Sequence, residues 1–159
     1  MQDNEAAIDR VPQESPGLAR RFWSASNEQS SAFTGNLTAS IENETLILAF
    51  ARGVTVRARR IGACDGAVST GVDTLAGTLG APEDVRIQIY DVAEERLSES
   101  AQSGGLCGPL PTQTIAAAEF VGEEGEWVLR LASFQERFTA NAAPDDPKAC
   151  FFFDYVPPS

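Results

Sequence analysis

The chain has 159 residues, with 12 basic and 23 acidic side chains, no histidine and a formal net charge of −11. This length suits one domain with its own core, and the charge argues against nucleic acid as a partner, because binding to a phosphate backbone requires clustered Lys and Arg. The absence of histidine excludes a Ser-His-Asp triad, a Cys-His dyad and a His-ligated metal, and the longest apolar run, LILAFA at 46–51, is too short for a transmembrane segment.

The first 21 residues are polar and contain two prolines. They have neither the basic start nor the apolar segment of a signal peptide, so we expect a disordered arm over 1–21 and a single β-rich domain over 22–159. We expect Phe22 and Trp23 to cover one end of the core. If the protein is exported, this sequence is expected to begin after the signal peptide.

Three strands joined by short turns are predicted next. They cover 31–41, 45–51 and 54–61, with turns at 42–44 and 52–53. Apolar and polar side chains alternate along them, which is the period of a half-buried strand, and turns this short join antiparallel neighbours. We therefore predict an antiparallel meander.

Strand signals continue to the C-terminus. Residues 62–84 are rich in glycine, and apolar side chains at helical spacing allow one short helix there. Residues 93–105 are expected to form a brief helix or a long loop. Four further strands are predicted, at 85–92, 112–121, 127–134 and 149–156. About seven or eight strands with at most one or two short helices predict an all-β fold, either a small antiparallel barrel or a sandwich.

The three cysteines, Cys64, Cys107 and Cys150, form no C-x-x-C pair, so a redox motif, a zinc knuckle or another metal site has no support. Cys107 lies in the glycine-rich stretch SGGLCGPLP. A nucleophilic Cys107 would need a basic neighbour or a helix N-terminus to lower the pKa of its thiol, and the nearest basic residue in sequence is Arg96. We expect no catalytic cysteine.

A disulfide accounts better for these cysteines. Glycines allow the chain to approach closely and turn sharply, and Cys150 opens the last predicted strand, which a cross-link would hold in place. A Cys107–Cys150 bridge, which we favour, spans 43 residues and leaves Cys64 as a thiol outside it. The pairings Cys64–Cys107 and Cys64–Cys150 remain open at this stage.

The LCG turn, the strand VRIQIYDV before it and the cysteine of the last strand resemble features of a set of small exported proteobacterial proteins with no assigned function. The meander FTGNLTAS…ETLILAFARGVTV is similar to theirs as well, so the resemblance covers most of residues 30–155. It implies export and a disulfide, and no chemistry. A second resemblance, to the small periplasmic β-barrel inhibitors of lysozyme, implies a compact barrel cross-linked to its final region, although no inhibitory loop residue matches.

The stretch VRARR at 56–60 is the one basic cluster. On a strand, Arg57 and Arg59 share one face, and Val56 and Ala58 lie on the other. The two arginines are a candidate anion-binding pair, since guanidinium offers a bidentate fork. We favour the alternative, an exposed face whose arginines pair with nearby acids.

Three acidic loops, at 81–85, 122–126 and 144–147, lack the spacing of a calcium-binding loop and are interpreted as solvated turns. With no catalytic residue, metal or cofactor indicated, we expect a periplasmic or secreted binding protein that acts without catalysis. Its partner is expected to be a cationic protein, as for a lysozyme inhibitor, or a small molecule in the barrel mouth. The alternatives are a hydrolase that uses carboxylates alone and a purely structural envelope protein.

Overall fold

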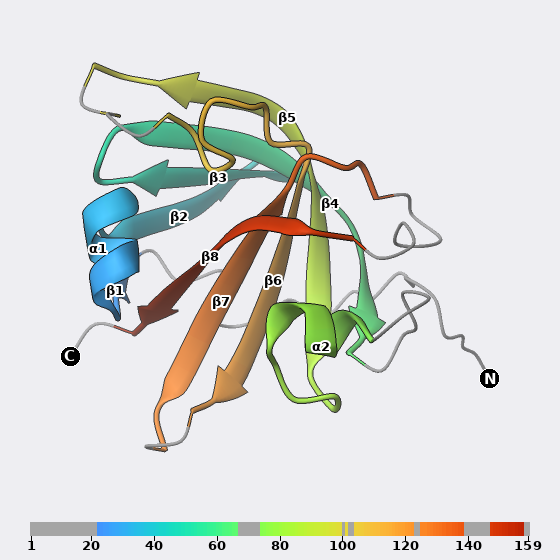
Figure 1. The fold of residues 1–159 in the computed structure, drawn as a ribbon. Coiled ribbons are helices and arrows are strands. Elements are labelled where there is room, and N and C mark those ends of the chain that lie inside the picture. The colour runs from blue at the N-terminus through green and yellow to red at the C-terminus, as the bar shows by residue number, and fades with distance from the viewer. Residues whose placement is uncertain are drawn as a thin grey trace.

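The computed structural model describes residues 22–66, 74–99, 101, 104–122, 125–138 and 147–157. In this part of the chain, eight antiparallel strands follow one another in sequence order and close into a barrel, because the last strand pairs with the first (Figure 1). The strands are β1 (Phe22–Ala25), β2 (Leu37–Glu42), β3 (Thr45–Phe50), β4 (Val54–Asp65), β5 (Arg86–Leu97), β6 (Thr114–Val121), β7 (Trp127–Phe134) and β8 (Ala149–Val156). The helices are α1 (Glu28–Phe33) and α2 (Leu75–Leu79). The predicted all-β fold is confirmed, as a barrel rather than a sandwich. The expected arm at 1–21 lies outside the described residues.

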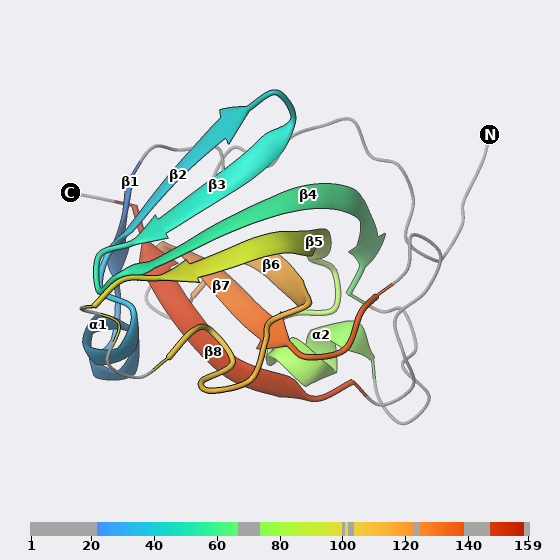
Figure 2. The ribbon, with the colours of Figure 1, turned by 90° about the horizontal axis from the view of Figure 1, so that it is seen from above.

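The predicted meander is formed by β2, β3 and β4, which Figure 2 shows side by side. The hairpin between β2 and β3 turns at Asn43 and Glu44, whose φ angles are 50° and 68°. Positive φ at both turn residues matches the twist of two adjoining strands. The next turn ends at Gly53, whose φ of 109° a glycine adopts without strain.

The predicted strand at 31–41 is wrong in its first part, because Glu28–Phe33 form α1. Asn27 caps this helix: its side chain accepts a hydrogen bond from a backbone NH in the first turn at 2.8 Å. The ring of Phe33, at the end of the helix, lies 5.4 Å from the ring of Phe153 on β8, measured between centroids. This contact joins residues far apart in the chain, which local alternation does not reveal.

Two other segments form strands that were not predicted from the sequence. Phe22 and Trp23 form part of a strand, β1, which closes the barrel between β2 and β8; the Trp23 side chain is buried in the main core, whereas Phe22 is exposed. The segment 93–105 was expected to be helix or loop, but β5 continues through Leu97 and pairs with β4 along this extension. The polar side chains of the extension hide it, because alternation identifies a strand only where one face is apolar.

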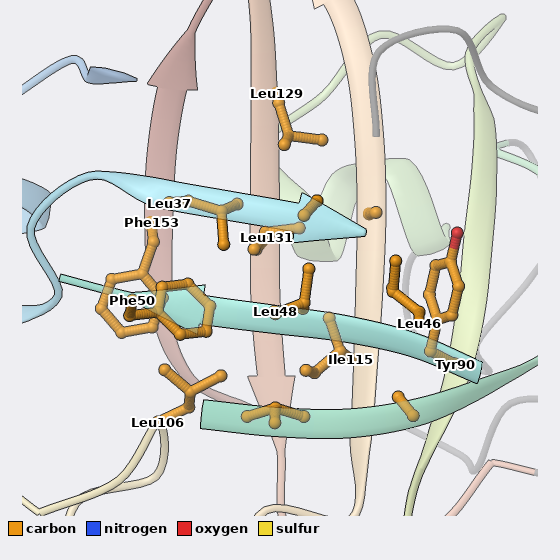
Figure 3. Close-up of a cluster of buried hydrophobic side chains, with 14 of the residues drawn as sticks. Leu37, Leu46, Leu48, Phe50, Tyr90, Leu106, Ile115, Leu129, Leu131 and Phe153 are labelled. Carbon is orange, nitrogen blue, oxygen red and sulfur yellow. The ribbon is translucent and has the colours of Figure 1, made fainter. Parts of the chain in front are cut away.

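The main hydrophobic core fills the barrel interior (Figure 3). Every second side chain of a strand points inward, as Leu46, Leu48 and Phe50 on β3 do, and all three are buried. An eight-stranded barrel is just wide enough for packed side chains or for one small ligand. Any binding site inside it must therefore lie where the apolar packing is interrupted.

A second buried layer lies on the outer faces of β5, β6 and β7, under α2. The short helix expected within 62–84 is confirmed as α2, whose Leu75 and Leu79 belong to this layer. Arg130 on β7 holds the end of the helix: its Nη1 donates to the carbonyl of Leu79 at 3.0 Å, and its Nε and Nη2 donate to the Asp154 carboxylate at 2.7 and 2.8 Å. The outer layer and the hydrogen bonds of Arg130 thus hold α2 against the outer face of the sheet.

Candidate functional site

Polar side chains interrupt the apolar interior at one end of the barrel. We call Arg60 on β4, Gln88 and Tyr90 on β5, and Glu119 on β6 the polar cluster. Arg60 lies opposite Tyr90 in the β4–β5 ladder, and directly opposed residues share a face of the sheet. Tyr90 belongs to the interior core, so Arg60 faces inward as well. Gln88 and Glu119 lie two residues from Tyr90 and from the interior residue Ala117, and follow the same alternation.

The guanidinium of Arg60 is only partly paired. Its Nε donates a hydrogen bond to Gln88 Oε1 at 2.5 Å, whereas its Nη2 is buried and has no hydrogen-bond partner among the described residues. A β-bulge follows, since the pairing with β5 shifts between Arg60 and Gly62 and Ile61 packs on the outer layer. Bulges often re-aim side chains beside functional sites. A buried donor without an acceptor costs roughly 1–3 kcal/mol, so an incoming acceptor would be favoured here.

Tyr90 supplies a neutral hydroxyl beside Arg60. Burial raises the pKa of Tyr90 to about 12; the charge of Arg60 lowers this pKa and that of Glu119 raises it, both by smaller amounts. The hydroxyl therefore stays protonated at neutral pH and can donate a hydrogen bond. In Figure 3 the Tyr90 ring lies beside Leu46, on the side of the core away from Leu106. The polar cluster and Leu106 thus mark opposite ends of the barrel interior.

Exposed apolar side chains continue the inward face beyond the polar cluster. Val121 and Trp127 lie directly opposite each other in the β6–β7 ladder and are 51% and 54% exposed. Trp127 follows the same alternation as the interior residue Leu129, so its indole lies on the inward face of β7. Val121 is two residues from Glu119, which corresponds to roughly 7 Å along a strand. We call Val121 and Trp127 the apolar rim; neither residue was predicted from the sequence to belong to a site.

The other end of the barrel is closed by residues 104–112, which we call the cysteine loop. Leu106 of this loop is buried in the interior core. The Glu95 carboxylate accepts hydrogen bonds from the NH of Leu106 at 2.7 Å and from the NH and hydroxyl of Thr112 at 3.3 and 2.9 Å. The Ser133 hydroxyl donates to the carbonyl of Leu106 at 2.7 Å. These bonds hold Leu106 as a plug at this end of the interior, away from the polar cluster.

The structure joins Cys107 of the cysteine loop to Cys150 of β8 in a disulfide with a sequence separation of 43, the pairing that the sequence favours. A disulfide-bonded Cys107 has no thiol that could act as a nucleophile. Cys64 is buried in the outer layer, outside this disulfide. The disulfide therefore stabilises the closed end of the barrel and contributes nothing to the polar cluster.

The candidate anion-binding residues Arg57 and Arg59 face outward. Arg57 lies opposite Glu94, with 4.0 Å between Nε and Oε1 and with both side chains about two-fifths exposed (43% and 42%). Arg59 is exposed and lies opposite Asp91. Exposed ion pairs of this kind contribute little to stability, and the arrangement is that of a solvated strand face. The inward arginine of this stretch is Arg60, which the sequence interpretation passed over.

Other classes of site find no support in the described ranges. No three His, Cys, Asp or Glu side chains gather there as a metal site, and no helix there is long and apolar enough to span a membrane. The acidic loops at 122–126 and 144–147 lie partly outside those ranges. No protein-family model matches the chain, and no significant match is found among curated proteins or solved structures.

Proposed function

We propose that this protein is an exported binding protein without catalytic activity, and that it takes a small molecule into the polar end of its barrel. The observation that carries the proposal is Arg60 Nη2, a buried donor inside the barrel with no hydrogen-bond partner among the described residues. Small-molecule sites are mostly apolar, with a few placed polar groups that orient the ligand. The polar cluster, between the apolar core and the apolar rim, has this composition.

Binding is favoured over carboxylate-based hydrolysis because the polar cluster contains one carboxylate, Glu119. Glycoside hydrolysis uses two carboxyl groups about 5–9.5 Å apart, one of which must act on the bond or on water. Glu95 lies at the closed end, where its oxygens accept three hydrogen bonds from the cysteine loop. Its part in the structure is therefore to hold that loop.

Export is supported by the disulfide, because disulfides persist in the periplasm and outside the cell and are rare in the reducing cytosol. Fractionation of the source cells tests this part of the proposal. We expect the protein in the periplasmic or extracellular fraction with Cys107 and Cys150 joined; a cytosolic protein with both thiols reduced would contradict it.

The net charge of −11 favours a second candidate function, the binding of a cationic protein such as a lysozyme. Attraction between exposed charges weakens as salt screens it. This version predicts inhibition of lysozyme at low salt that declines as salt is added. Full lysozyme activity in low salt with the barrel protein in stoichiometric excess excludes it.

The small-molecule proposal is tested by titrating the oxidised protein with two fluorescent amphiphiles, anionic anilinonaphthalene sulfonate and a neutral naphthalene ketone of similar size. We expect at least one dye to bind saturably, one per chain, and to bind more weakly to Trp127→Ala. The matched control is Phe152→Ala, since Phe152 is also apolar and exposed (39%) but points to the outer face of β8. No saturable binding of either dye, or an equal loss in both variants, would contradict the proposal.

A further inference from the structure

We infer that the ligand is an amphiphile with a single negative charge: a carboxylate or a similar monoanionic group that pairs with Arg60, and an apolar chain that lies along the apolar rim. The inference rests on the proposed function and specifies the class of ligand. The polar cluster, the apolar rim and the closed end each restrict a different part of the ligand.

The head group is constrained by Arg60. Its guanidinium is always charged, and its hydrogen bond within the barrel goes to the neutral amide of Gln88. A buried charge is stabilised best by an acceptor of opposite charge, because hydrogen bonds between ionised partners are roughly twice as strong as neutral ones. Arg60 Nη2 has no acceptor among the described residues, so a ligand carboxylate would complete its pairing.

The number of charges on the head group is constrained by Tyr90 and Glu119. The Tyr90 hydroxyl, kept protonated by burial, can donate a hydrogen bond to the same anion that Arg60 binds. The carboxylate of Glu119 lies on the same inward face, because Glu119 is two residues along β6 from Ala117, which pairs with Gln88. It therefore repels each negative charge brought into the polar cluster. One negative charge can pair with Arg60, whereas a second would find no second guanidinium in the polar cluster to pair with.

The apolar part of the ligand is constrained by the two ends of the barrel. Toward the closed end the interior is filled by the core, with Leu106 buried at the far end and tied to Glu95. In the opposite direction, the exposed pair Val121 and Trp127 continues the inward face beyond Glu119. An alkyl chain attached to an anion at Arg60 would therefore run outward and cover these two side chains.

The test compares three ligands of equal chain length on the oxidised protein by calorimetry, below their aggregation concentrations: decanoate, decanol and decyl phosphate. We expect decanoate to bind at least about tenfold more tightly than decanol, because one charge-assisted hydrogen bond contributes roughly 1.5–3 kcal/mol and about 1.4 kcal/mol corresponds to a factor of ten. We expect decyl phosphate, a dianion at alkaline pH, to lose affinity relative to decanoate as its second charge forms.

Two variants locate the head group. Arg60→Gln should abolish the preference for decanoate over decanol, whereas Arg59→Gln makes the same change of charge on the outer face and should keep it. Urea unfolding checks that each variant is folded. If Arg60→Gln does not fold, the comparison of the three ligands on the unchanged protein still tests the inference.

Equal binding of decanoate and decanol overturns the inference and leaves the proposed function intact. Binding of neither ligand overturns the inference, and the dye titration then decides the proposed function. A preference that survives in folded Arg60→Gln, or strongest binding by doubly charged decyl phosphate, also overturns it.

Discussion

Breaking the Cys107–Cys150 disulfide should lower the stability of the barrel by an amount that follows from the chain length between the two residues. The bond closes a loop of 43 residues, for which the loop-entropy relation gives about 4 kcal/mol. In a domain of this size, such a loss corresponds to a fall in melting temperature of roughly 8–16 °C. The bond also ties the plug residue Leu106 to β8, so its loss acts on the closed end of the barrel first.

The assay is urea unfolding of the oxidised and the reduced protein, followed by tryptophan fluorescence. The double variant Cys107→Ala/Cys150→Ala should show about the stability of the reduced protein. Cys64→Ala is the matched control, because it removes a buried sulfur and leaves the disulfide in place; it should still lose stability on reduction. The reasoning is refuted if the oxidised and reduced proteins unfold at the same urea concentration.

Three further predictions concern single side chains. The pKa of Tyr90 rises from 10.0 to about 12 on folding, so the stability that this shift contributes is complete below pH 10.0 and is lost as pH rises through about 12. Because Phe cannot ionise, the free energy of unfolding of Tyr90→Phe in urea should fall over this pH range by about 2–3 kcal/mol less than that of the unchanged protein. The same pH profile in both proteins would contradict the burial of the hydroxyl. Glu95→Gln should weaken the hold on the cysteine loop and speed amide hydrogen exchange at Leu106 and Thr112, and unaltered exchange rates there would show that the carboxylate does not hold the loop. Arg130→Lys keeps the charge but loses the fork that joins Asp154 to the end of α2, and should destabilise the protein by roughly 1–3 kcal/mol, whereas the same change at the more exposed Arg137 should have a smaller effect.

Strands with one clearly apolar face could be predicted from the sequence almost to the residue. The predicted ranges 127–134 and 149–156 coincide with β7 and β8, and α2 lies inside the stretch predicted to hold one short helix. Alternation sets the face of each side chain locally, so no distant contact was needed. The same reasoning explains why α1 was missed: six residues carry too little periodicity, and the helix is stabilised by its cap and by the packing of Phe33 on β8.

Only part of the candidate site could be predicted from the sequence. Alternation through VRARR places Val56 and Ala58 inside, and continuing it by two residues would have placed Arg60 inside as well. The candidate pair predicted from the sequence, Arg57 and Arg59, lies on the opposite face. That Arg60 meets Gln88 and Tyr90 depends on the β4–β5 register and on the bulge after Arg60, which are long-range features. The role of Glu95 depends likewise on a loop that folds back from residues 104–112.

The central claim, that the polar end of the barrel binds a small molecule, is tested most directly by amide chemical shifts during a titration of the oxidised protein with decanoate. The account predicts saturable shifts at Arg60, Gln88, Tyr90 and Glu119 and at the apolar rim, with Leu106 at the closed end unchanged. Shifts centred on the cysteine loop, or a spectrum that does not change up to the aggregation concentration of the ligand, would contradict it.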